Sequence, residues 1–128
     1  MEIPTDLRYT DSHEWIRDEG DGTVTVGITA VAADQLGELV YVELPQVGRR
    51  CAKDESCAVV ESTKAASDVY APVAGEVVAV NDALPSNPGQ LNQAPYAGGW
   101  LFRMKLNDVK ELAALLDASA YRESTGAP

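Results

Sequence analysis

The segment around Lys64 constrains the fold more than any other part of the chain. Residues 60–69 read Val-Glu-Ser-Thr-Lys-Ala-Ala-Ser-Asp-Val, which is nearly a mirror image about the Lys64-Ala65 pair. Such symmetry is typical of two short antiparallel strands joined by a two-residue turn. We therefore predict a β-hairpin with Lys64 at its tip, where a modifying enzyme can reach the amine on its long, flexible stem.

Two details of this predicted hairpin break the usual local rules. The mirror register places Glu61 directly opposite Asp68, and like charges in that position destabilise a sheet. The turn also lacks the Asn-Gly or Asp-Gly pair that a tight hairpin favours. Departures of this kind are expected at functional sites. A solvated hairpin with an ordinary surface lysine is the alternative that the same pattern allows.

The rest of the chain alternates apolar and polar residues over short stretches, which predicts further β-strands. We expect strands over residues 13–18, 23–28, 39–44, 58–62, 68–70, 76–80 and 101–106. The first two form a hairpin across a Gly-Asp-Gly turn. Many short strands with regular turns indicate a mostly β fold, either a sandwich or a flattened barrel, built as one domain over residues 1–128.

Two helices are predicted among these strands. The first spans residues 30–36, after a threonine N-cap and before a glycine that stops the helix. The second spans residues 109–122, where Asp108 and Glu111 have the spacing of a capping box. Four apolar side chains recur on one face of this helix and would seal the sheet: Leu112, Leu115, Leu116 and Tyr121. Residues 123–128 are expected to form a frayed tail.

The charge of the chain limits its partners. The net charge is −10 and the pI is near 4.4. Binding to nucleic acid requires clustered Lys and Arg, so we expect neither nucleic acid nor an anionic membrane surface as a partner. An acidic surface instead suits docking to basic patches on other proteins. The N-terminal residues resemble neither a secretory signal nor a transit peptide, so we expect a cytoplasmic protein.

The residues that usually carry catalysis or bind metals are scarce. His13 is the only histidine, and neither a nucleophile elbow nor a phosphate-binding glycine motif accompanies it. The spacing of Cys51 and Cys57 fits neither a zinc nor a redox motif. We expect two unpaired, partly buried thiols, although residues 53–56 can turn the chain and bring the two together. The chain therefore has the character of a carrier or binding module, with no metal site and no enzymatic activity.

Several motifs, in order along nearly the whole chain, resemble the H-protein family of the glycine cleavage system. They are Ser12-His13-Glu14-Trp15, Val26-Gly27-Ile28-Thr29, Leu36-Gly37-Glu38, Val42-Glu43-Leu44-Pro45, residues 60–68, residues 71–77 and Gly99-Trp100. The lysine motif alone is typical of any lipoyl-like domain. The Ser-His-Glu-Trp and Gly-Trp elements, at the right separation, make the resemblance specific.

The resemblance implies a fold and a cofactor. The fold would be a flattened lipoyl/biotinyl-type hybrid barrel-sandwich of two antiparallel sheets, with a short internal helix and a C-terminal helix. Lipoic acid would be attached to Lys64 in amide linkage by a lipoylating enzyme. Thr63 stands where the family more often has valine, and since both residues are β-branched the turn is expected to survive.

The function implied by the resemblance is that of a non-catalytic, monomeric shuttle, whose chemistry resides in the cofactor. Its lipoyl arm would take an aminomethyl group from the pyridoxal-phosphate-dependent glycine decarboxylase and deliver it to the aminomethyltransferase. Dihydrolipoamide dehydrogenase would then reoxidise the arm by thiol–disulfide chemistry.

Four residues acquire roles from the resemblance. The loaded arm would fold into a cleft lined by Ser12, Glu14 and Asp68, where a carboxylate suits a cationic amine. Glu61 and Asp68 would flank the modified lysine, where acidity can serve recognition by the lipoylating enzyme.

The sequence also allows other functions. A biotin carrier has a similar fold, but such domains flank their lysine with methionines. A lipoyl domain of a 2-oxoacid dehydrogenase is smaller and lacks the Ser-His-Glu-Trp region. An H-like relay protein that supplies lipoyl groups to other enzymes, and an unmodified interaction module, are further alternatives.

Overall fold

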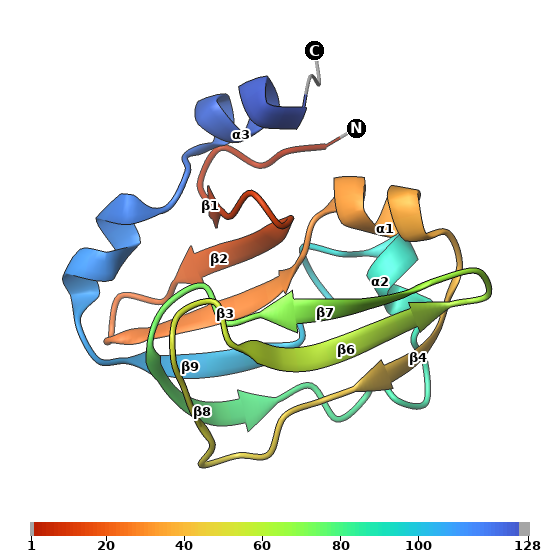
Figure 1. Ribbon diagram of the computed structural model, residues 1–128, viewed down its shortest axis with the longest axis horizontal. Helices are drawn as coiled ribbons and strands as arrows, with labels where there is room; N and C mark the ends of the chain where they lie inside the picture. Colours follow the sequence, from red (N-terminus) through yellow and green to blue (C-terminus); the bar gives the residue numbers. More distant parts are fainter. Residues whose placement is uncertain (1, 126–128) are drawn as a thin grey trace.

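The computed structural model describes residues 2–125, which form two antiparallel sheets with helical segments around them (Figure 1). The strands are β1 (Arg8–Tyr9), β2 (Glu14–Asp18), β3 (Thr23–Ile28), β4 (Leu39–Glu43), β5 (Arg50–Cys51), β6 (Ser56–Ser62), β7 (Ala66–Tyr70), β8 (Gly75–Val80) and β9 (Phe102–Leu106). One sheet has six strands in the order β1-β2-β3-β9-β8-β5, and the other has three in the order β4-β6-β7. The predicted two-sheet, mostly β architecture is thus confirmed.

Alternating burial along the strands explains how the two sheets pack. In β9, Phe102, Met104 and Leu106 are buried, whereas Arg103 and Lys105 face solvent. The buried side chains of both sheets meet in one apolar cluster, which also receives residues from the connecting loops. Burial of this apolar surface is the main force that holds the sheets together.

The internal helix α1 (Ala30–Leu36) begins and ends at the residues predicted from the sequence. The hydroxyl of Thr29 accepts a hydrogen bond from the Ala32 N–H at 3.2 Å, which satisfies one of the free amides of the first turn. Gly37 follows with a φ of 84°, a left-handed conformation that favours glycine. The turn after α1 then leads into β4 beside the β6–β7 hairpin (Figure 1). A further short helix, α2 (Gln90–Gln93), was not predicted.

The prediction of one long C-terminal helix is wrong, because this region forms two separate helices. A 3-10 helix, η1 (Val109–Ala114), is followed by extended residues and then by α3 (Ala118–Thr125). Between them, Leu116 exchanges two backbone hydrogen bonds of 2.8 Å with Tyr9, so its peptide groups cannot serve a helix. The carboxylate of Asp117 then accepts a hydrogen bond from the Ala120 N–H at 2.8 Å and caps the first turn of α3.

Two smaller expectations about this region also differ from the structure. Asp108 caps η1 through the Lys110 N–H, but Glu111 does not complete a capping box. Its Oε2 accepts a hydrogen bond from the Ala74 N–H at 2.9 Å, which ties η1 to the turn before β8. Residues 123–125 belong to α3 and are not frayed, while residues 126–128 of the expected tail lie outside the described part of the chain.

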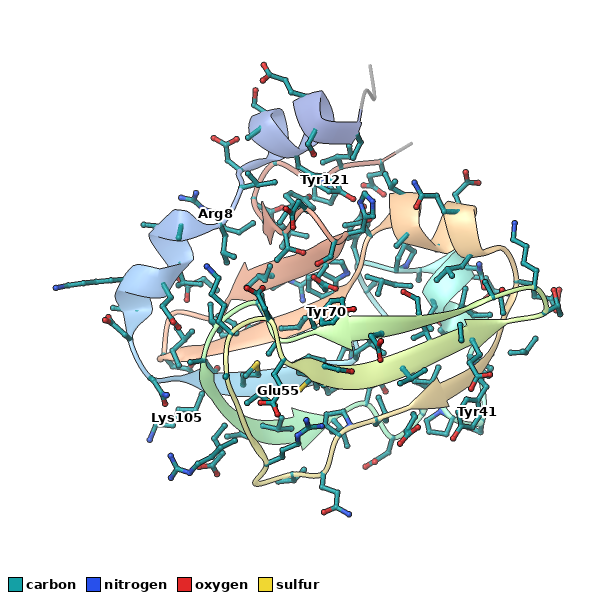
Figure 2. All side chains as sticks on the ribbon, in the orientation of Figure 1. Arg8, Tyr41, Glu55, Tyr70, Lys105 and Tyr121 are labelled. Atoms are coloured by element: carbon teal, nitrogen blue, oxygen red, sulfur yellow. The ribbon has the colours of Figure 1, made fainter. Side chains whose placement is uncertain are left out.

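A second buried cluster joins α3 to β1 and β2, and Tyr121 is its centre (Figure 2). Its ring stacks on Tyr9 with centroids 4.6 Å apart. Its hydroxyl is hydrogen-bonded to Thr29 Oγ1 and to His13 Nδ1, each at 2.7 Å. The C-terminal helix therefore closes the end of the six-stranded sheet. Of the predicted apolar stripe, Tyr121 and Leu116 belong to this cluster, while Leu115 and Leu112 pack with the main one.

We expect the free energy of unfolding to fall at alkaline pH because of Tyr121. Burial raises the pKa of Tyr121 to about 12, whereas an unfolded tyrosine titrates near its ordinary value of about 10. The stabilisation that comes from the buried, neutral Tyr121 hydroxyl is complete below about pH 10. It is lost as the pH rises through about 12, and the free energy of unfolding then falls by up to about 1.4 kcal/mol per pH unit. Urea unfolding of Tyr121→Phe should depend less steeply on pH than the wild type; equal slopes would contradict this assignment.

Candidate functional site

The predicted hairpin is present, and Lys64 lies in its turn. β6 and β7 pair in an antiparallel register, and their connection projects beyond the sheet beside α1 and β4 (Figure 1). Ser62 N–H donates to the Ala65 carbonyl at 2.7 Å, so Thr63 and Lys64 are the two central residues of the turn. The Ser62 hydroxyl accepts hydrogen bonds from the backbone N–H groups of Lys64 and Ala65, at 3.2 and 3.0 Å.

The predicted register of this hairpin is wrong by two residues. Glu61 lies opposite Ala66, and Asp68 lies opposite Val59, so the expected opposition of Glu61 and Asp68 does not occur. The turn closes one residue earlier than the mirror symmetry suggests, because the Ser62 side chain binds the turn amides. A shift of two residues keeps every side chain on its original face, so Val60 stays buried.

The amine of Lys64 is free to react. The side chain is exposed and lies beside the turn after α1, where a methyl group added to Gly37 would be 3.4 Å from Lys64 Cε. Residues 2–125 contain two ion pairs, Arg49–Glu55 and Arg50–Glu76, and neither involves Lys64. Both sides of the turn are held by hydrogen bonds, so the lysine extends from a fixed backbone.

Glu14 is a buried carboxylate at the start of β2, with only 1% of its surface exposed. Its Oε1 accepts hydrogen bonds from the hydroxyl of Thr10 and, at 2.6 Å, from that of Ser12. Its Oε2 accepts one from the backbone N–H of Tyr70, at the end of β7, at 3.2 Å. Buried charge requires such partners, and here they connect the N-terminal segment to the hairpin that carries Lys64.

Asp68 and Glu61 occupy the outer face of the three-stranded sheet. Asp68 is exposed on β7 and accepts a hydrogen bond from the Ser56 hydroxyl at 2.9 Å. Glu61 is two residues along β6 from Val59, the partner of Asp68, so both carboxylates point to the same side of the sheet. Of the predicted cleft residues, Ser12 and Glu14 are joined directly by a hydrogen bond. Asp68 lies near them through β7, because it is two residues before Tyr70, whose N–H is bound by Glu14.

Two participants were missed by sequence reasoning. Thr10 stands within the same polar motif and could have been included on that ground. Tyr70 contributes only its backbone N–H. Every residue except proline carries that group, so the sequence holds no signal for it.

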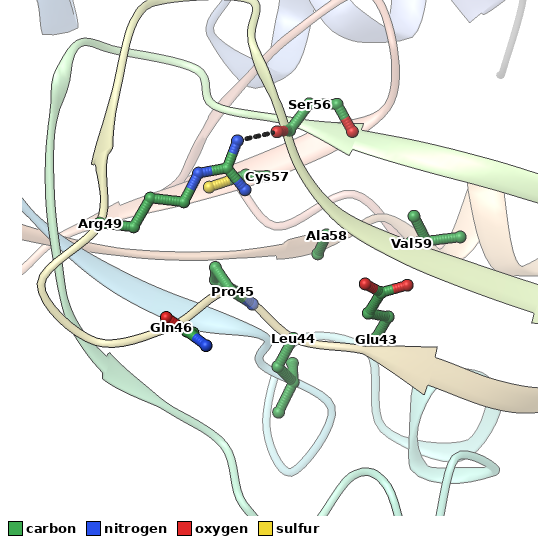
Figure 3. A pocket seen from close by; sticks show the side chains of 9 residues that line it. All are labelled: Glu43, Leu44, Pro45, Gln46, Arg49, Ser56, Cys57, Ala58 and Val59. Atoms are coloured by element: carbon green, nitrogen blue, oxygen red, sulfur yellow. Dashed lines mark hydrogen bonds between the residues drawn. The ribbon is translucent and has the colours of Figure 1, made fainter.

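One cavity of the molecule is lined by residues other than those around Lys64 (Figure 3). A cavity of about 330 Å³ is bounded by residues 43–46, Arg49 and residues 56–59. The cavity adjoins the first half of β6, whereas Lys64 lies two residues after Ser62, which ends that strand. Arg49 lies at one side of it and donates a hydrogen bond to the Ser56 carbonyl at 2.8 Å (Figure 3). This cavity is therefore separate from the site around Lys64.

Within residues 2–125, no three His, Cys, Asp or Glu side chains are grouped so as to hold a metal ion. None of the helices in this part of the chain has the length and apolar character needed to cross a membrane. What the fold presents is an exposed amine on the tip of a hairpin in a two-sheet scaffold. These features are compatible with a carrier domain, which holds a covalently attached group for other proteins to use.

Comparison with known proteins identifies the family. The model of the family described as glycine cleavage H-protein matches residues 7–127. Glycine cleavage system H proteins from two Escherichia coli strains are 57% and 56% identical over 119 residues, which cover 93% of this chain and 92% of each relative. The crystal structure of a glycine cleavage system H protein from Mycobacterium marinum is 43% identical, with a TM-score of 0.88 over 97% of this chain and 99% of that one. The chain belongs to the glycine cleavage H-protein family.

Membership of this family confirms the expected class of function. The protein is a lipoyl carrier subunit of the glycine cleavage system, and it is not itself catalytic. Its lipoic acid is held on a lysine, as the resemblance implied. The alternatives of a biotin carrier and of an unmodified interaction module are thereby set aside.

Proposed function

We propose that Lys64 is the lysine that carries lipoic acid in this H-protein. The observation that carries the proposal is the position of Lys64 in the turn of a hairpin between two directly paired strands. The other three lysines differ: Lys105 lies within β9, Lys110 lies in η1, and Lys53 lies in a loop between strands of different sheets. Of the four, Lys64 alone lies in the turn of a hairpin between two directly paired strands.

The site suits an acyl group in amide linkage. Within residues 2–125 the amine has no ionic partner to displace, and the turn amides are already bound by Ser62. When bound, lipoic acid supplies a disulfide that can accept an aminomethyl group and be left as a dithiol. We propose glycine decarboxylase, the aminomethyltransferase, dihydrolipoamide dehydrogenase and a lipoylating enzyme as the partners of this site. The monomeric state and the cytoplasmic location remain predictions.

A cleft for the loaded arm is proposed at Ser12, Glu14 and Asp68. β7 leads from the tip to this group, and its four residue steps from Ala66 to Tyr70 span about 13 Å. Ser12 is exposed and donates to the buried Glu14, so a cationic amine that replaces this hydroxyl would gain a charge-assisted hydrogen bond. Asp68 adds a second carboxylate on the solvent side of β7.

A different role is proposed for the acidic residues nearest the tip. Glu61 on β6 and Asp68 on β7 place two carboxylates on the outer face of the hairpin. We propose that an enzyme that approaches Lys64 meets these two charges. Complementary charge on the lipoylating enzyme would raise the rate of encounter more than the final affinity.

Removing the carboxylate charge should shorten the lifetime of the aminomethylated protein. We expect Glu14→Gln to release the amine about tenfold faster, because a charge-assisted hydrogen bond is worth about 1.5 kcal/mol or more. Asp68→Asn is expected to have a smaller effect, about twofold to fivefold, because its carboxylate is exposed. The measurement is the release of ammonia with time from the isolated, loaded protein.

A matched control for this experiment is Glu123→Gln. It removes one negative charge from α3, away from the hairpin, and should leave the lifetime unchanged. Unchanged release from both Glu14→Gln and Asp68→Asn, in proteins that still fold and accept lipoate, would overturn the proposed cleft while leaving the assignment of Lys64 intact.

A further inference from the structure

Cys51 and Cys57 meet between the two sheets. Cys51 is in β5 of the six-stranded sheet, and Cys57 is in β6 of the three-stranded sheet. Both are free thiols, as predicted, but both are buried, and their Sγ atoms lie 3.0 Å apart. The site around Lys64 uses neither residue.

The turn between the cysteines holds them in place. Asp54 adopts a left-handed φ of 70°, and its N–H donates to the Ala71 carbonyl at 2.8 Å. Ala71 N–H in turn donates to the Glu55 carbonyl at 2.8 Å, and Glu55 Oε1 accepts from the Ala52 N–H at 2.9 Å. The two thiols are therefore brought together by a hydrogen-bonded loop and do not meet by chance.

One of the two cysteines borders a cavity, although its side chain is buried. Cys57 lines the cavity of about 330 Å³ described above, together with Arg49 (Figure 3). A molecule of a few atoms fits this cavity, while a folded protein does not. Burial and, to a smaller extent, the neighbouring Cys51 raise the pKa of the Cys57 thiol to about 12, whereas the guanidinium of Arg49 acts in the opposite direction. Reaction at Cys57 is therefore slow near neutral pH and accelerates as the pH rises.

We propose that Cys51 and Cys57 form a redox site, at which a hydroperoxide oxidises the two thiols to a disulfide that joins the sheets. The Cys57 thiolate attacks the outer oxygen of the hydroperoxide, and the O–O bond breaks to give a sulfenic acid and an alcohol, or water for hydrogen peroxide. Cys51 then attacks the sulfenic sulfur, the S–S bond forms, and the hydroxyl leaves as water. The two thiols lose two electrons, the peroxide gains them, and both thiol protons end on oxygen.

The oxidised protein should be harder to unfold. The sulfurs need to approach by about 1 Å to reach a bond of about 2.05 Å. The closed loop spans residues 51–57, and a loop of that length predicts a rise in unfolding temperature of roughly 5–10 °C. A dithiol such as dithiothreitol should reverse the rise by thiol–disulfide exchange.

The test uses hydrogen peroxide on the full chain, in both its lipoylated and its unlipoylated form. Trypsin cleaves after Lys53, between the two cysteines, so a disulfide is detected as two linked peptides that separate on reduction. We expect this linked pair in both forms, together with the higher unfolding temperature. Recovery of two free thiols, of sulfinic or sulfonic acids, or of disulfide-linked dimers would overturn the proposal.

Single variants provide the control. Cys51→Ala and Cys57→Ala should each fail to give the linked peptides and the temperature shift, because the chain contains no other cysteine. The peptide mapping of the wild-type protein decides the question even if a variant does not fold. Since the cysteines are separate from Lys64, failure here would leave the proposed function untouched.

Discussion

Replacing Lys64 with arginine is expected to abolish lipoylation and, with it, all transfer through the glycine cleavage system. A guanidinium keeps the positive charge but does not form the amide that holds lipoic acid. Since Lys64 is exposed and its backbone N–H binds Ser62 in either case, the hairpin should remain folded. Intact mass after incubation with a lipoylating enzyme and lipoate is the direct measurement, followed by activity with the purified partner enzymes.

Lys53→Arg is the matched control for this variant. Lys53 is also exposed and in a turn, and this substitution should leave both lipoylation and activity at the level of the wild type. The free energy of unfolding of each variant should stay within about 0.5 kcal/mol of the wild type. A lipoyl-sized mass increment on Lys64→Arg would move the attachment site to another lysine and refute the assignment.

The largest expected effect on stability comes from Gly75→Ala. A Cβ atom at Gly75 would lie 2.2 Å from the carbonyl oxygen of Lys105 and 3.1 Å from its carbon. Gly75 is paired with Cys51 on one side and Leu106 on the other, so the clash is with backbone that is fixed in the sheet. We expect a loss of about 3 kcal/mol or more, at the upper end of the cost of overpacking.

Gly89→Ala separates this clash from the general effect of losing a glycine. Gly89 has a φ of −61°, and the nearest atom to an added Cβ, Asn87 Oδ1, is 3.8 Å away. This variant should differ from the wild type by no more than about 0.5 kcal/mol in urea unfolding. If Gly75→Ala and Gly89→Ala unfold at the same urea concentration, β8 and β9 are less rigid than the sheet geometry requires.

The sequence allowed the strands around Lys64 to be predicted, but it did not determine their register. The mirror pattern around Lys64 correctly indicated a hairpin with the lysine at its tip. The mirror pattern is centred on Lys64 and Ala65, whereas the turn is centred on Thr63 and Lys64, because the Ser62 side chain closes it. A mirror pattern contains no information about such a hydrogen bond. The face of each side chain was still correct, because burial alternates with a period of two.

The features that were missed depend on contacts between residues far apart in the chain. The apolar spacing of residues 109–122 is genuinely helical, yet Leu116 pairs with Tyr9 and interrupts the helix. The turn that lets Cys51 and Cys57 meet was allowed by the sequence, but their position between two different sheets depends on the packing of the whole chain. β1 and β5 have two residues each, too few for an alternating pattern to be recognised.

The closure of the turn by Ser62 bears on how the mature protein is made. The hydrogen bonds that shape the tip use the Ser62 hydroxyl and backbone groups only, and none involves the Lys64 amine. Acylation of that amine therefore makes and breaks no bond that holds the fold. With the prosthetic group attached at Lys64, as proposed, biosynthesis can complete the polypeptide first and add the group at any later time. A pool of finished but unmodified carrier can then await its cofactor.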